Sequence, residues 1–99
     1  MAAPHFYPFT TDVASAGTRA QISDSSRKVL KVWVKPHEGN SGVTYFGDVT
    51  VSATVGGWSM STTEEGQMFD FSLAPPTLDS FYVDAATNGD DVDTIFLLE

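Results

Sequence analysis

Residues 81–98 read FYVDAATNGDDVDTIFLL, and the spacing of their apolar side chains decides the fold class. Every second position is apolar or Thr on both sides of Asn88-Gly89: Phe81, Val83 and Ala85 come before it, and Val92, Thr94, Phe96 and Leu98 after it. Period two is the side-chain repeat of a β-strand, and Asn-Gly between two such segments is a strong hairpin signal. Ile95 and Leu97 make the other row of the last strand apolar too. We therefore expect this strand to be central and covered on both faces.

The same alternation recurs upstream of this stretch. Three further segments show it: Leu30, Val32 and Val34 with Lys31, Trp33 and Lys35 between them; Val49, Val51, Ala53 and Val55; and Phe69, Phe71 and Leu73. No window has the apolar pattern of an amphipathic helix over three turns. Turn-forming pairs separate the segments, namely Gly47-Asp48, Gly56-Gly57 and Pro75-Pro76. The pattern predicts an all-β fold, either an antiparallel β-sandwich or a small jelly-roll-like barrel, with six to eight strands.

The first 13 residues do not follow the alternation. Residues 4–9 read PHFYPF, an aromatic and proline-rich run that we interpret as too irregular for a strand. Either this segment lies back on its own sandwich, or it extends onto a neighbour and buries its rings there. We divide the chain into an extended N-terminal arm, residues 1–13, and a single β-sandwich domain, residues 14–99. The candidate partner-binding residues of the arm are Pro4, His5, Phe6, Tyr7, Pro8 and Phe9.

Charge is distributed unevenly along the 99 residues, whose net charge is -8. All Lys and Arg residues precede position 36, whereas residues 36–99 hold only acidic charges. A solvated acidic surface explains this distribution, and so does a basic strand face that meets an acidic partner. The candidate basic interface face consists of Arg27, Lys28, Lys31, Trp33 and Lys35. We expect no nucleic-acid partner, because phosphate binding needs clustered cations.

No motif of catalysis or cofactor binding is evident, and we expect no enzyme, no cofactor and no metal site. The absence of Cys excludes thiol chemistry and Cys-based zinc sites. His37-Glu38 lies in a turn-rich loop, where polar residues are expected in any case. Residues 88–93, NGDDVD, offer carboxylates for Ca²⁺ but depart from the EF-hand spacing, and a turn accounts for them. We expect no membrane partner, since the N-terminus lacks signal-peptide character and no apolar run is long enough to span a bilayer.

Three segments resemble a pattern found in small structural proteins of tailed bacteriophages. They are VWVK at residues 32–35 followed by EGNSGVTYFGDVTVSA at 38–53, then EGQMFDF at 65–71, and LDSFYVDAATNGD at 78–90. The resemblance spans residues 17–98. Glu65 replaces the usual Pro before the glycine, and the aromatic segment before residue 13 is not part of the pattern.

The resemblance implies an all-β virion component, most simply a capsid decoration (cement) protein made in the host cytoplasm. Its partners would be the major capsid protein and further copies of itself, and capsid geometry suggests a homotrimer near threefold axes. Such a protein would stabilise the head by bridging capsid subunits. Two alternatives stay open: a neck, tail or baseplate component, and a carbohydrate- or host-receptor-binding module that uses Trp33, Tyr45 and Trp58 as platforms.

Overall fold

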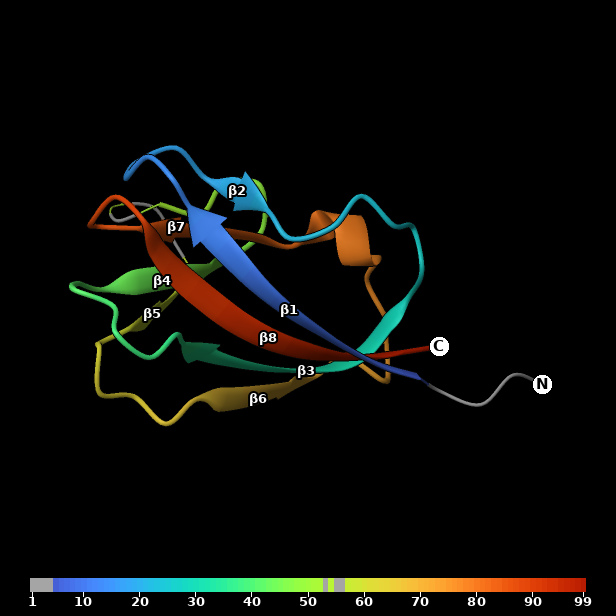
Figure 1. Ribbon diagram of the computed structural model, residues 1–99. Coiled ribbons are helices and arrows are strands. Elements are labelled where there is room, and N and C mark those ends of the chain that lie inside the picture. The colour runs from blue at the N-terminus through green and yellow to red at the C-terminus, as the bar shows by residue number, and fades with distance from the viewer. Residues whose placement is uncertain (1–4, 53, 55–56) are drawn as a thin grey trace.

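The computed structural model describes residues 5–52, 54 and 57–99, and these residues form an all-β sandwich (Figure 1). The strands are β1 (His5–Val13), β2 (Ala20–Gln21), β3 (Val29–Pro36), β4 (Thr44–Gly47), β5 (Trp58–Met60), β6 (Gln67–Asp70), β7 (Tyr82–Ala85) and β8 (Asp90–Leu98). One short 3-10 turn, η1 (Leu78–Ser80), precedes β7. The expected β-sandwich and the expected number of strands are confirmed for this part of the chain.

The strands form two antiparallel sheets of four strands each. One sheet has the order β1-β8-β3-β6, and the other has the order β2-β7-β4-β5. Within the first sheet β8 lies between β1 and β3, as expected for a central strand, and pairs with β1 along nine residues. We refer to this first sheet as the β8 sheet, since β8 is its longest interior strand.

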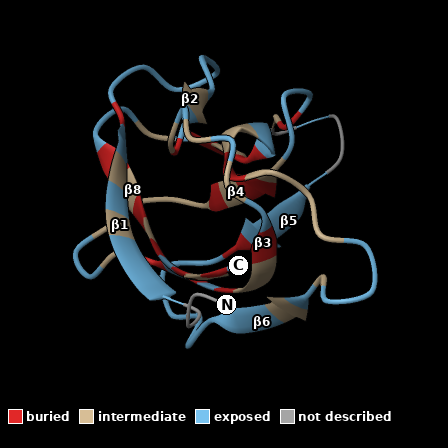
Figure 2. Ribbon diagram, turned by 90° about the vertical axis from the view of Figure 1, so that its right-hand side faces the viewer, coloured by how far each residue is buried: buried red, intermediate tan, exposed pale blue. Residues whose placement is uncertain are grey.

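The core lies between the two sheets and is made by buried residues that alternate with more exposed ones along the strands; Figure 2 shows where these buried residues lie on the ribbon. The row before Asn88-Gly89 and the row after it both face inward, as expected. Their buried members are Phe81, Val83 and Ala85, and Val92, Thr94, Phe96 and Leu98. Phe81 is at the centre, with ring centroids 5.5 Å from Phe46 and 5.3 Å from Phe96. Aromatic pairs at such distances add stability beyond the area they bury.

Strand β1 corrects the interpretation of residues 1–13 as an extended arm. Residues 5–13 lie on their own sandwich and pair with β8 from His5 to Val13, while Pro4 lies outside the described residues. Pro8 does not prevent this pairing, because β1 is an edge strand and a proline's missing N–H is tolerated at a sheet edge. Residues 5–13 therefore belong to the sandwich and not to an arm outside it.

Two of the expected strands are wrong in extent for the same physical reason. Residues 49–52 are not in a strand, and Ala53 and Val55 lie outside the described residues. The Asp48 carboxylate accepts hydrogen bonds from the backbone N–H and the hydroxyl of Thr50, at 2.8 and 2.6 Å, which turns the chain. Asp70 does the same with Ser72, so β6 ends at Asp70 and Leu73 is fully exposed.

Two further expectations about the C-terminal strands need correction. Asn88-Gly89 forms a turn in which Gly89 has a φ of +83°, but β7 and β8 belong to different sheets and do not make a hairpin. The second face of β8 is not covered, because Ile95 is 44% exposed.

The expected buried row of the strand around residues 30–34 also differs at its start. In β3 the register shifts between Val29 and Lys31, so Val29 is buried in place of Leu30.

None of the described residues belongs to a helix that is long and apolar enough to cross a membrane.

Candidate binding surface

The outer face of the β8 sheet presents its side chains in rows that run across the four strands. One row consists of Pro8, Ile95, Trp33 and Met68, on β1, β8, β3 and β6 respectively. The next row towards the chain termini holds Phe6, Leu97, Lys31 and Asp70, and the row on the other side holds Thr10, Asp93 and Lys35. The pairing register therefore places an apolar band across the whole sheet, which consists of Pro8, Ile95, Trp33 and Met68 together with Phe6 and Leu97 of the adjacent row.

The apolar band is exposed to solvent. Trp33, Met68 and Ile95 are 38%, 40% and 44% exposed, and Phe6 is 62% exposed. The rings of Phe6 and Trp33 lie 5.9 Å apart across the intervening β8. A groove of about 410 Å³ lies on this face, and its lining includes apolar Trp33, Met68 and Ile95 and charged Lys35, Glu65 and Asp93. Contiguous apolar surface with a polar rim is typical of a site that binds another protein.

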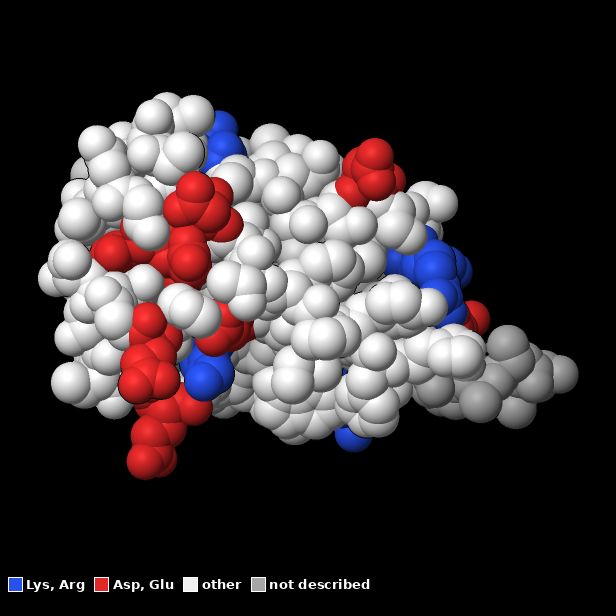
Figure 3. All heavy atoms as spheres, viewed as in Figure 1, with Lys and Arg blue, Asp and Glu red and all other residues white. Residues whose placement is uncertain are grey.

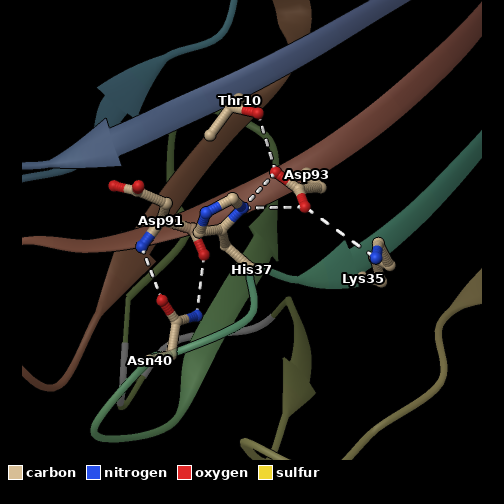
Figure 4. Close-up of polar contacts among 6 residues, drawn as sticks. All are labelled: Thr10, Lys35, His37, Asn40, Asp91 and Asp93. Carbon is tan, nitrogen blue, oxygen red and sulfur yellow. Dashed lines mark hydrogen bonds and ion pairs between the residues drawn. The ribbon is translucent and has the colours of Figure 1, made fainter.

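A polar cluster closes one end of this face (Figure 4). Nδ1 of His37 lies 2.9 Å from each carboxylate oxygen of Asp93, and the Thr10 hydroxyl donates to the same carboxylate at 2.8 Å. Nζ of Lys35 lies 4.0 Å from Asp93. The hydrogen bond and the charge of Asp93 raise the pKa of His37 above its ordinary value.

Asp91 extends the cluster towards the end of β1. Its pKa is raised by burial first, then by the hydrogen bond and the charge of Asp12, its direct neighbour on β1. The backbone of Asp91 is held by Asn40, whose amide donates to the Asp91 carbonyl at 2.7 Å and accepts from its N–H at 2.9 Å. Asp12, Asp91 and Asp93 give this end of the face a negative charge.

The five residues expected to form one basic face do not lie together. Lys31, Trp33 and Lys35 share the outer face of β3, where Lys31 is opposite Asp70 and Lys35 is beside Asp93. Arg27 and Lys28 precede β3 near the C-terminus. Arg27 donates to the Tyr7 hydroxyl at 3.0 Å and to the Glu99 carbonyl at 2.8 Å. The backbone of Lys28 forms an isolated antiparallel β-bridge with that of Thr77.

Charged side chains gather at the two ends of the molecule (Figure 3). Acidic side chains gather over the end of the sheet where β1 ends and β8 begins, with basic side chains among and above them, and a further basic patch lies near the C-terminal end beside an acidic group. We call the region around Arg27, Lys28 and the first residues of β1 the basic end. It includes His5, Phe6 and Tyr7, so the basic residues before β3 and the expected aromatic binding residues meet there in space.

Two buried carboxylates have structural roles, namely Asp90, which belongs to the segment that suggested calcium, and Asp84, which does not. Asp90 is 5% exposed, and its two oxygens accept the backbone N–H groups of Ser41 and Gly42 at 2.9 and 2.8 Å. Asp84 is 1% exposed and accepts from the backbone of Gly17 and Ala85. No group of three or more His, Asp or Glu side chains in the described ranges is arranged to hold a metal ion.

The three aromatic residues considered as sugar platforms lie apart. Trp33 is on the outer face of the β8 sheet. Trp58 is on β5 of the other sheet, where it pairs with Phe46 of β4. The Trp58 ring packs edge-on against Phe69, with ring centroids 5.7 Å apart. Tyr45 alternates with buried Phe46 on β4 and so faces outward from that other sheet. They do not form one platform.

Sequence reasoning missed three residues of the apolar band, namely Ile95, Leu97 and Met68. A signal for two of them was present, since Ile95 and Leu97 form a second apolar row on β8. That row was interpreted as a covered face of the sheet. Pairing with β3 and β6 is what brings Met68 beside Trp33, and no local pattern contains that information.

No protein-family model matches the chain, and no curated protein sequence matches it at a significant level.

Proposed function

We propose that this chain is a structural protein of a tailed-bacteriophage virion, and that it acts as a capsid decoration (cement) protein. The observation that carries the proposal is the pairing of the strands. β1 pairs with β8, β2 with β7, β3 with β6, and β4 with β5. The first half of the chain is thus paired in reverse order with the second half.

Such nested pairing describes a long antiparallel ribbon that is rolled into two facing sheets. Its eight strands divide between the sheets in the orders β1-β8-β3-β6 and β2-β7-β4-β5. We assign this arrangement to the jelly rolls, which are eight-stranded double sheets made of two Greek keys. Viral capsid proteins and lectins use this architecture, so the topology supports a virion role and the resemblance noted in the sequence agrees with it.

A fold alone does not define a function, and the surfaces must supply the rest of the argument. The molecule presents an exposed apolar band and a basic end, both suited to contacts with proteins. The buried carboxylates of Asp84 and Asp90 accept hydrogen bonds from backbone N–H groups. These features favour a protein that functions by binding.

The basic end is the surface we assign to the capsid. There the Arg27 side chain donates to the hydroxyl of the exposed Tyr7. Lys28 is the next residue along the chain after Arg27, and exposed Phe6 is the one before Tyr7. An aromatic anchor next to an Arg is the composition of an interface hot spot. Contact at this end would bring the first residues of β1 against the major capsid protein, as was expected of an N-terminal arm. β1 would stay paired with β8 in the sandwich.

An add-back experiment tests this function. Particles of the phage that encodes the protein are prepared from a deletion mutant, mixed with the purified chain and separated by sedimentation. We expect saturable binding, together with recovered resistance of the heads to heat-induced loss of DNA. The double variant R27E/K28E should bind much less, because it reverses the charge of the basic end, whereas exposed Asp24→Ala should bind normally. A chain that does not bind heads but binds isolated tails would place it in the neck, tail or baseplate.

A further inference from the structure

The outward-facing side chains of β8 and of the neighbouring segment from Lys31 to His37 have complementary chemistry. Along β8 the order is Asp91, Asp93, Ile95 and Leu97; opposite them stand His37, Lys35, Trp33 and Lys31. Each acidic residue of one row is next to a residue that carries or can acquire positive charge in the other (Figure 4). Ile95 stands next to Trp33, and Leu97 next to the aliphatic stem of Lys31.

We propose that this face binds a second copy of the same chain about a twofold axis parallel to the strands, between β8 and β3. This rotation places the β8 row of one copy over the β3 row of the other. Asp93 then meets the partner copy's Lys35, Ile95 meets its Trp33, and Asp91 meets its His37. An isologous interface requires such self-complementarity, since every contact occurs twice.

The charges select this axis over the alternative. A twofold axis perpendicular to the strands, along the apolar band, would keep β3 over β3 and β8 over β8. Lys31 would then lie over Lys35, and Asp93 would lie over Leu97. That arrangement sets like charges together and buries a carboxylate against an apolar side chain, which costs free energy. The axis parallel to the strands avoids the like-charge contact and brings Asp93 over Lys35, although it also places Phe6 at the edge of one copy over Asp70 at the edge of the other.

The size of the face agrees with a reversible dimer. Four strands spaced about 4.8 Å apart and four outward rows spaced about 6.8 Å apart cover roughly 500 Å². Two copies would bury roughly 1,000 Å², near the lower limit for a specific interface. The net charge of -8 on each copy opposes association at long range, and this repulsion is screened at physiological salt. We therefore expect dimers that form and dissociate with protein concentration.

This dimer differs from the threefold assembly suggested by capsid geometry, and it does not depend on a virion role. It also leaves Arg27 and Lys28 of the basic end accessible, because they precede the paired rows, whereas Phe6 lies on the dimer face. A dimer could thus present two basic ends to a surface, one from each copy.

Sedimentation velocity of the full chain at several concentrations tests the proposal. The wild type should show a concentration-dependent dimer, and Ile95→Asp should weaken it by at least about tenfold, with circular dichroism confirming that the variant is folded. Ile95 is 44% exposed, so the fold does not depend on it.

A charge-exchange pair gives the sharper test. Lys35→Asp alone and Asp93→Lys alone each place like charges across the proposed interface, so each should be monomeric. Mixed in equal amounts they restore opposite charges at both positions and should form a heterodimer. A wild type that stays monomeric up to about 1 mM would overturn the proposal, as would a trimer insensitive to Ile95→Asp or a mixture that does not associate.

Discussion

Nδ1 of His37 is equidistant from the two carboxylate oxygens of Asp93, at 2.9 Å from each. The two residues are 56 positions apart in sequence and meet because β3 pairs with β8 in a register that ends beside this loop. The same carboxylate accepts the Thr10 hydroxyl and lies near Lys35. One side chain of β8 thus connects both of its neighbouring strands on the outer face.

This contact makes stability depend on pH. The pKa of His37 is raised above 6.5 in the folded protein by the hydrogen bond and charge of Asp93; desolvation opposes this rise, Asp91 adds to it, and Lys35 opposes it slightly. Protonated His37 therefore favours the folded state. The stabilisation is fully present below pH 6.5, the unfolded value, and is lost as pH rises through the raised folded pKa. Proton NMR titration should show the raised pKa, and Asp93→Asn should lower it; an unchanged pKa in that variant would contradict this account.

Asp90 should be essential for the position of the loop before β4. Its carboxylate is buried and accepts two backbone N–H groups, from Ser41 and Gly42. Asp90→Ala leaves both donors without this acceptor, and we expect a loss of about 3 kcal/mol in the free energy of unfolding. Urea denaturation measures the change, with exposed Asp24→Ala as the control. Equal midpoints for the two variants would show that the loop does not need the carboxylate.

Two glycines with positive φ should respond differently to the same substitution. A Cβ on Gly66 would lie 2.9 Å from the backbone oxygen of Val34 and 3.0 Å from Cβ of Lys35, whereas one on Gly39 would meet nothing within 4 Å. Gly39→Ala should cost about 1 kcal/mol for backbone strain alone. Gly66→Ala should cost more, about 3 kcal/mol, because it must also displace β3. Thermal unfolding of both variants decides this, and similar melting temperatures would count against the described contact.

Adjacent residues of β8 should differ in their importance for the fold. Phe96 is fully buried between Phe9 and Phe81, with ring centroids at 5.8 and 5.3 Å. We expect Phe96→Ala to lower the free energy of unfolding by about 4 kcal/mol. Ile95→Ala should cost less than about 1 kcal/mol, since its side chain lies on the exposed face. Denaturant titrations at low protein concentration measure both values; a reversed order would contradict the alternation of β8.

The buried rows were predictable from the sequence because period-two spacing reports directly on burial. Phe81, Val83 and Ala85 are buried as the alternation predicts. The same rule failed after Asp48 and at Asp70, where a carboxylate captures the backbone N–H two residues later and turns the chain. This side-chain hydrogen bond competes with the sheet ladder, and alternation of apolar residues does not reveal it.

Pairing between strands limited the prediction of the binding surface. Trp33 and Lys35 were correctly expected on one face of a strand, but their acidic and apolar neighbours are contributed by β8 and β6. The interpretation of β1 as an arm failed because Pro8 and the aromatic residues around it make the sequence look irregular, although an edge strand tolerates Pro8. Such relationships depend on which strand is a neighbour in space, and local sequence does not specify that.

The copy number of this protein in purified virions tests the central claim most directly. Quantitative mass spectrometry of intact particles would compare it with the major capsid protein. A decoration role predicts a ratio near one to one, or a simple fraction of it. A ratio tens of times lower, or absence from the particles, would contradict it.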